Sequence, residues 1–234
     1  MTSERQRRIA QRLATERGRQ ARRKRLSWIA AAAILIVLAS AVTVAVLHRP
    51  DEAAASGTGE LGPEGIPLQT GAPLASVAGA ASGQPVDGIR CDASEQVAYH
   101  IHTHLAIFVD GAPRSIPYGI GVVTPAVTQT AQGPFAQATR CYYWLHTHAG
   151  DGVIHVESPA QQQHTLGEFF NIWRQPLSQQ QVGPVTGIVT AYVNGTRYSG
   201  DPRGIVLSER EDIQLDVGTP IVSPERVDWS ASQL

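Results

Sequence analysis

Two histidine tracts constrain how this chain can fold. The first reads YHIHTHLAIFV and contains His100, His102 and His104, and the second reads YWLHTHAGDGVIHVES and contains His146, His148 and His155. Successive side chains of an extended strand point to opposite faces. Each tract, if extended, therefore places its histidines on one face and its apolar residues on the other. This alternation predicts strands with one face in the core and one face of imidazoles.

The second tract predicts a β-hairpin. If Gly150-Asp151 is a two-residue loop, His146 lies opposite His155, and the apolar residues of both arms share the other face. A register slip of one residue would bring the histidines into the core, so the pattern favours this pairing.

One short helix is predicted at about 165–174. Thr165 and Glu168 have the spacing of a capping box, apolar residues follow at helical intervals, and Pro176 ends the pattern. Asp110-Gly111 and a similar VNG sequence at 193–195 are hairpin-turn signals. We expect a β-rich α+β fold in which an antiparallel or mixed sheet packs its apolar face against the helix.

The histidine face has the chemistry of a metal site. Zinc and copper take three or four nitrogen, sulfur or oxygen ligands at about 2.0–2.3 Å, and cross-strand Cβ atoms lie only about 5 Å apart. The predicted ligands are His100, His102, His104, His146, His148 and His155, with Asp151 and Glu157 as candidate carboxylates. Met1 is the one methionine of the chain, which argues against a thioether-rich Cu(I) carrier and leaves copper or zinc as the expected metal.

Two other readings stay open. A metal with three histidine ligands and an open position could serve a small hydrolase or oxidoreductase, with Glu157 as a general base. Alternatively, the histidines are surface residues of an interaction or adhesion module that binds no metal.

The two cysteines, Cys91 and Cys141, each precede a histidine tract. A disulfide between them would close a loop of about 50 residues and stabilise the fold by on the order of 3–4 kcal/mol. The alternative is that one thiolate is itself a metal ligand.

The N-terminal part predicts a membrane anchor. Residues 1–25 carry ten Lys/Arg and two glutamates, a net charge of +8, and the uncharged segment 26–47 follows. Twenty-two helical residues span roughly 33 Å, enough to cross a bilayer. The basic flank predicts a cytoplasmic N-terminus at the plasma membrane, contact of residues 5–25 with anionic lipid headgroups, and an extracytoplasmic remainder. The alternative to an uncleaved anchor is a cleaved signal peptide, although its apolar region would be only about 7–15 residues long.

The rest of the chain divides by composition. Residues 48–88 are rich in Ala, Gly, Pro and Ser and predict a flexible linker. We expect the folded domain at 89–228 and a short tail at 229–234. The residues after 25 carry a net charge of −9, which suits cations rather than nucleic acid.

Residues 91–222 resemble an uncharacterised family of bacterial membrane-anchored or exported proteins. The resemblance rests on C-x8-HIHTHLAIFVDG, IPYGIG, CYYWLHTH, DGVIHVESP, TLGEFFNIW, YVNG, GDPRGIVL and IQLDVG. It implies a shared exported module and no particular activity. Relatives often carry an aspartate directly after the second HTH, where this chain has Ala149. If that aspartate is a metal ligand in the relatives, Asp151 would have to replace it here.

Taken together, these patterns predict a single-pass membrane protein whose extracytoplasmic domain binds a transition metal and serves in metal handling or sensing.

Overall fold

The computed structural model describes residues 59–232 and 234. The strands are β1 (Cys91–Asp92), β2 (Tyr99–Val109), β3 (Ala112–Arg114), β4 (Val122–Thr130), β5 (Gly133–Tyr143), β6 (Leu145–His146), β7 (Val153–Ser158), β8 (Leu177–Ser178), β9 (Gln181–Val182), β10 (Val185–Thr186), β11 (Val189–Val193), β12 (Thr196–Tyr198) and β13 (Glu211–Val217). The helices are α2 (Leu166–Trp173) and the short 3-10 turns η1 (Pro202–Gly204) and η2 (Trp229–Ala231). The structure is β-rich with one α-helix among the described residues, as the sequence predicts.

The predicted membrane helix at 26–47 and the basic segment 1–25 lie outside the described residues. Among the residues that are described, no helix has both the length and the apolar character needed to cross a membrane.

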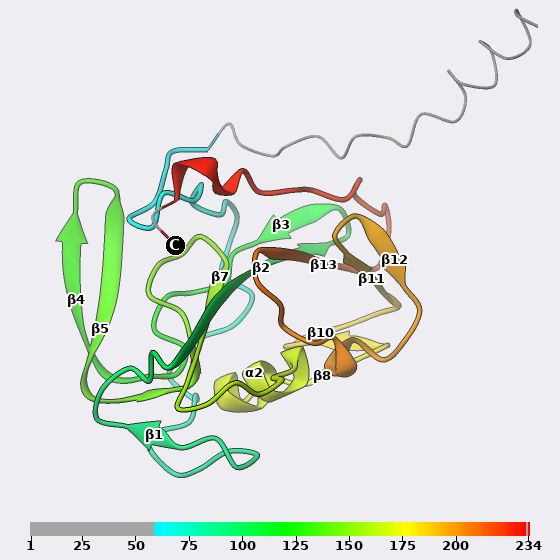
Figure 1. Ribbon diagram of the computed structural model, residues 1–234. Coiled ribbons are helices and arrows are strands. Elements are labelled where there is room, and N and C mark those ends of the chain that lie inside the picture. The colour runs from blue at the N-terminus through cyan, green and yellow to red at the C-terminus, as the bar shows by residue number, and fades with distance from the viewer. Residues whose placement is uncertain (1–58, 233) are drawn as a thin grey trace, which may run out of the picture. The chain divides into compact units, whose positions relative to one another are not determined.

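The main sheet is mixed and has β2 near its centre. Its order is β12-β11-β13-β2-β7-β6, and β3 also pairs with β2. Strand β2 runs antiparallel to β7 and parallel to β13, and the three strands lie side by side in Figure 1. The apolar residues of β2 face the core: Leu105, Ile107 and Val109 are all buried. The alternation read from the sequence is therefore confirmed for this strand.

Two hairpins follow from their turn residues. Asp110 and Gly111 join β2 to β3, and Asn194 and Gly195 join β11 to β12. All four residues have φ between 50° and 77°. These are the positive values that a two-residue type I′ turn requires, and Asn, Asp and Gly reach them with the least strain.

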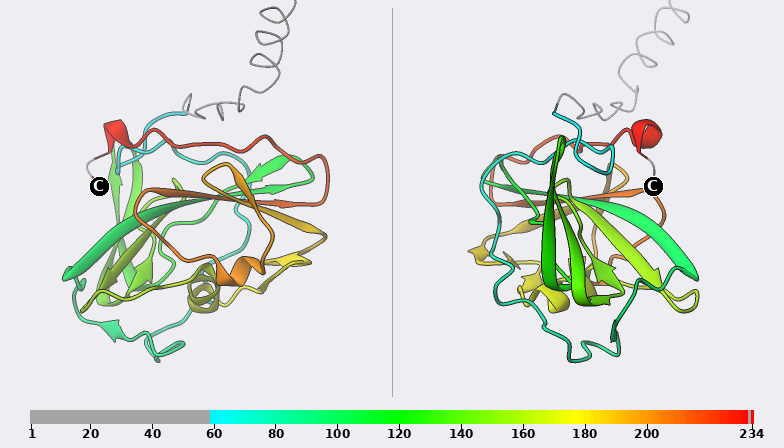
Figure 2. Two further views of the ribbon diagram at one scale, coloured as in Figure 1. Left: turned by 45° about the vertical axis from the view of Figure 1, so that its right-hand side comes forward. Right: turned by 90° about the vertical axis from the view of Figure 1, so that its left-hand side faces the viewer.

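Helix α2 packs on the apolar side of the main sheet. Thr165 caps its N-terminus, and the reciprocal hydrogen bonds with Glu168 form the predicted capping box. Phe169, Phe170 and Trp173 are fully buried in the same core cluster as the apolar face of β2. The views in Figure 2 place α2 on the side of the sheet opposite the C-terminal segment.

A second sheet, which sequence patterns did not predict, stands beside the first. It has the order β1-β5-β4, and most residues of β4 from Thr124 to Gln129 are exposed. The disulfide joins Cys91 in β1 to Cys141 in β5, so the predicted bond is confirmed and neither sulfur is a free metal ligand. The disulfide thus ties the segment before the first histidine tract to the strand that leads into the second.

The segment before residue 89 is more ordered than a flexible linker. Residues 59–88 pack against the domain, and Ile66 is fully buried. The side-chain amide of Gln69 donates to the carbonyl of Leu105 in β2 and accepts from the N–H of Ile116. The folded unit therefore begins at least 30 residues earlier than composition suggested, because a few buried side chains hold an otherwise polar, Gly- and Pro-rich segment in place.

Candidate metal centre

The pairing of three strands gathers the histidines on one face. In the β2–β7 pair His102 lies opposite His155 and His100 opposite Glu157. In the β6–β7 pair His146 lies opposite His155, the register predicted for the second tract. His155 therefore occupies the middle of the face, with the histidines of β2 on one side and His146 of β6 on the other.

Two groups of these residues could hold a metal ion. The inner set is His146, His148, His155 and Glu157, and the outer set is His100, His102 and His155. Within each set the candidate ligand atoms all lie within 4.8 Å of one another. The four residues of the inner set are at most 4 % exposed, so this set is closed to solvent.

His146 and His148 present lone pairs to each other. The Nδ1 of His146 lies 2.8 Å from the carbonyl oxygen of Tyr143, and the Nδ1 of His148 lies 2.6 Å from that of Ala136. A carbonyl oxygen can only accept, so each Nδ1 carries the proton. The pKa of each imidazole is lowered, first by burial and then by the charges of neighbouring histidines, which leaves both rings neutral.

The two Nε2 atoms are consequently unprotonated and lie 3.1 Å apart. Two lone pairs at this distance repel each other, and a cation bound by both removes the repulsion. Backbone carbonyls that fix the tautomer of an imidazole in this way are a regular feature of metal-bound histidine.

His155 lies between two carboxylates. Its Nε2 is 2.7 Å from Oε1 of Glu64, and its Nδ1 is 3.3 Å from Oε1 of Glu157. Burial by itself would lower the pKa of His155, but the hydrogen bonds and charges of Glu157 and Glu64 outweigh burial and raise it to about 9. The ring is therefore protonated at both nitrogens at neutral pH, and a metal ion bound at Nδ1 beside Glu157 would displace the proton there while Nε2–H continues to donate to Glu64.

The outer set contains one residue with an unused nitrogen. Nε2 of His102 is buried and has no hydrogen-bond partner among the described residues. Burial, followed by the charges of His155 and His100, lowers the pKa of His102 to about 3, so this ring is neutral and able to act as a ligand. Its ring centroid lies 4.5 Å from that of His100 and 4.6 Å from that of His155.

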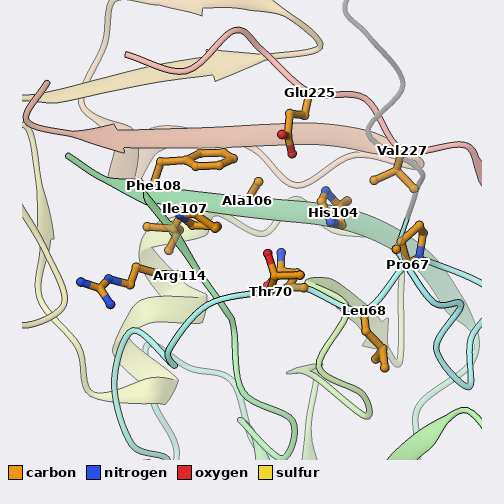
Figure 3. Close-up of a pocket in the computed structure, with 13 residues that line it drawn as sticks. Pro67, Leu68, Thr70, His104, Ala106, Ile107, Phe108, Arg114, Glu225 and Val227 are labelled. Carbon is orange, nitrogen blue, oxygen red and sulfur yellow. The ribbon is translucent and has the colours of Figure 1, made fainter. Parts of the chain in front are cut away.

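Two predicted ligands lie outside both sets. Nε2 of His104 lies 3.0 Å from the carbonyl oxygen of Asp151, and the ring lines a separate cavity of about 220 Å³ with Phe108 and Glu225 (Figure 3). The carboxylate of Asp151 accepts a hydrogen bond from the N–H of Val153. Burial and the nearby charge of Glu64 raise the pKa of Asp151 well above its usual value.

Two carboxylates near the cluster were not predicted from the sequence. Glu64, 91 residues before His155 in the chain, is 6 % exposed and contacts that ring directly. Oε1 of Glu95 lies 3.4 Å from Nε2 of His148 at the edge of the cluster. Neither glutamate belongs to a recognisable spacing pattern, so no local signal in the sequence identifies them.

Comparisons with protein-family models, with curated proteins and with solved structures find no match to this chain. The assignment of the centre therefore depends on the residues and their geometry.

Proposed function

We propose that this protein is a single-pass plasma-membrane protein, with its N-terminus in the cytoplasm, whose extracytoplasmic domain binds a transition-metal ion for handling or sensing. The observation that carries the metal-binding part is the pair of buried Nε2 atoms of His146 and His148, which lie 3.1 Å apart while both Nδ1 atoms face backbone carbonyls. The charge pattern of residues 1–47 supports the membrane part. The disulfide is consistent with an oxidising compartment outside the cytoplasm.

Zinc or copper suits the inner set best. Three imidazoles and one carboxylate provide three nitrogen ligands and an oxygen, which both Zn(II) and Cu(II) accept.

The burial of the inner set favours binding over catalysis. Structural metal sites are filled by protein ligands, whereas catalytic sites keep one position open for water or substrate. Both oxygens of Glu157 face the cluster, since they lie 3.0 Å from His100, 3.3 Å from His155 and 3.9 Å from His146. These distances favour Glu157 as a ligand over Glu157 as a general base acting on a substrate.

The test is metal analysis of the purified full-length chain and of the double variant His146→Asn/His148→Asn. The asparagine amide can still donate to the carbonyls of Tyr143 and Ala136, while the Nε2 ligand atoms are lost. We expect one ion per wild-type chain and much weaker binding in the double variant, in which the outer set alone is intact, with the far-UV circular dichroism unchanged.

His104→Gln is the matched control. It changes a histidine of β2 on the same face and keeps a donor for the carbonyl of Asp151, so it should retain the ion. Equal metal content in wild type and double variant would contradict the proposal. For the membrane part, protease added to intact spheroplasts should cleave the C-terminal domain and spare residues 1–25.

A further inference from the structure

The inner and outer sets overlap in a single residue. His155 belongs to both, and the two sets together contain six side chains from β2, the β6 region and β7. Because Nε2 of His155 donates to Glu64, only Nδ1 of this imidazole is available to an ion, and an ion in the inner set leaves the outer set with two ligands. The shared residue therefore favours two alternative positions for one ion over two separate sites for two ions.

The sets differ in their access to solvent. The inner residues are at most 4 % exposed, whereas the side chain of His100 in the outer set is 37 % exposed. The outer set also touches the inner one, since Nε2 of His100 lies 3.0 Å from Oε1 of Glu157. His100 is thus the exposed member of the two sets, and the other five residues are at most 4 % exposed.

We propose that the metal ion enters and leaves the inner set through the outer set, with His155 common to both positions. This inference rests on the proposed metal-binding function. In the outer position His100, His102 and His155 hold the ion, and the unpartnered Nε2 of His102 supplies a ready donor. The ion then exchanges His100 and His102 for His146, His148 and Glu157. Stepwise exchange spares the ion the loss of all its protein ligands at once.

The other edge of the cluster offers a rival route. Glu95 lies 3.4 Å from Nε2 of His148, and its side chain is 37 % exposed, as much as that of His100. Side-chain exposure alone therefore does not distinguish the His100 edge from the Glu95 edge as the route of entry. The His100 edge has a three-residue donor set leading inward, and Glu95 belongs to neither set.

The experiment measures how fast Zn²⁺ moves in and out of the purified full-length chain. Loading is followed by stopped flow after mixing with Zn²⁺, and release is followed after mixing the loaded chain with an excess of a chromogenic chelator. Equilibrium affinity and stoichiometry are measured on the same samples. His100→Gln is the test variant, because a glutamine amide can still donate to Glu157 but replaces the imidazole ligand.

We expect His100→Gln to slow loading and release by a similar factor of about ten or more, since each 1.4 kcal/mol added to a barrier is tenfold in rate. Its affinity should stay close to that of the wild type, because the inner set is intact. A residue that only supports the fold would change affinity or stability and not both rates together. The same substitution at His104, outside both sets, should leave both rates unchanged.

Three results would overturn the inference. One is slow exchange in Glu95→Gln with normal exchange in His100→Gln, which would place the route at the other edge. A second is two Zn²⁺ ions bound per wild-type chain, because the sets would then be filled together. The third is a wild-type chain that binds neither Zn²⁺ nor Cu²⁺, which would contradict the proposed function itself. Normal binding with unchanged exchange rates in His100→Gln would instead contradict only the route through the outer set.

Discussion

At the scale of single residues, Glu64 decides how His155 is oriented. It accepts a hydrogen bond from this imidazole at 2.7 Å and lies in a buried position. Partners of this kind typically contribute a factor of about 10–100 in metal affinity. We therefore expect Glu64→Gln to weaken Zn²⁺ binding by about that factor in a chelator competition, while Glu60→Gln, a change to an exposed glutamate four residues earlier, has no effect. Equal affinity in both variants would remove Glu64 from the centre.

The alternation of side chains along a strand predicts which residues of the centre share one face of the sheet. His100, His102, His146, His148 and His155 were all placed on one face by alternation, and the structure brings them together. Parity could not show where along the face the cluster ends. His104 shares the face but lies too far along β2 to join either set. Glu64 belongs to a segment whose position depends on tertiary packing alone.

Asp212 makes the free energy of unfolding of the protein depend on pH. Burial raises its pKa to about 6, although the N–H of Val227 and the guanidinium of Arg226 act in the opposite direction. An unfolded chain has an aspartate pKa of about 3.9. The folded protein therefore holds this proton more tightly, so the stabilising contribution is complete below about pH 4 and is lost as the pH rises towards 6.

Asp212→Asn should remove this dependence. The gap between pKa values corresponds to about 3 kcal/mol. Relative to wild type, the free energy of unfolding of the variant should rise by up to that amount between pH 4 and pH 7. Urea titrations at both pH values, with chelator present, measure the difference. A difference that is constant with pH would mean that the carboxyl is hydrated in the folded state.

At the scale of elements, local chemistry explains which ones the sequence predicts. Helix α2 and the hairpin turns carry their own signals, a capping box and Asp-Gly or Asn-Gly pairs, so they could be located without the fold. The β4–β5 hairpin has no such signals. Pro125 lies within β4, the register shifts between Val123 and Pro125, and most of the strand is exposed, which leaves no apolar alternation to read.

The disulfide joins β1 to β5 within the second sheet, and β5 also contacts the histidine cluster. Cys141 is in β5, and the carbonyl of Ala136 in the same strand fixes the ring of His148. Closing a loop of 50 residues contributes about 4 kcal/mol in the chain-entropy model. Cys91→Ala/Cys141→Ala should lower the free energy of unfolding by about 3–4 kcal/mol in denaturant titrations. Reduction of the wild type should give a similar loss, and a change below about 1 kcal/mol in both would show that packing alone holds β1 to β5.

At the scale of the whole described domain, the centre joins parts of the chain that are distant in sequence. Glu64 comes from the segment that precedes the sheets, His102 from β2, His148 from the turn after β6 and His155 from β7. Strand β7 belongs to the main sheet, and Glu64 of the early segment contacts His155 on its histidine face. An ion bound at the inner set would therefore crosslink β7 to the strand–turn segment around β6, and Glu64 would carry this crosslink to the early segment.

Metal removal should consequently lower the stability of the domain as a unit. An ion that binds only the folded state adds about 4 kcal/mol when its free concentration is a thousand times Kd, which for a chain of this size raises the melting temperature by about 10 °C. Calorimetry of the full-length chain with Zn²⁺ and with chelator measures this gain.

His146→Asn/His148→Asn should show no ion-dependent gain. In chelator the same variant should melt at or above the wild-type temperature, because it lacks the two lone pairs that face each other at 3.1 Å. A double variant that gains as much as wild type from Zn²⁺ would place the stabilising ion elsewhere.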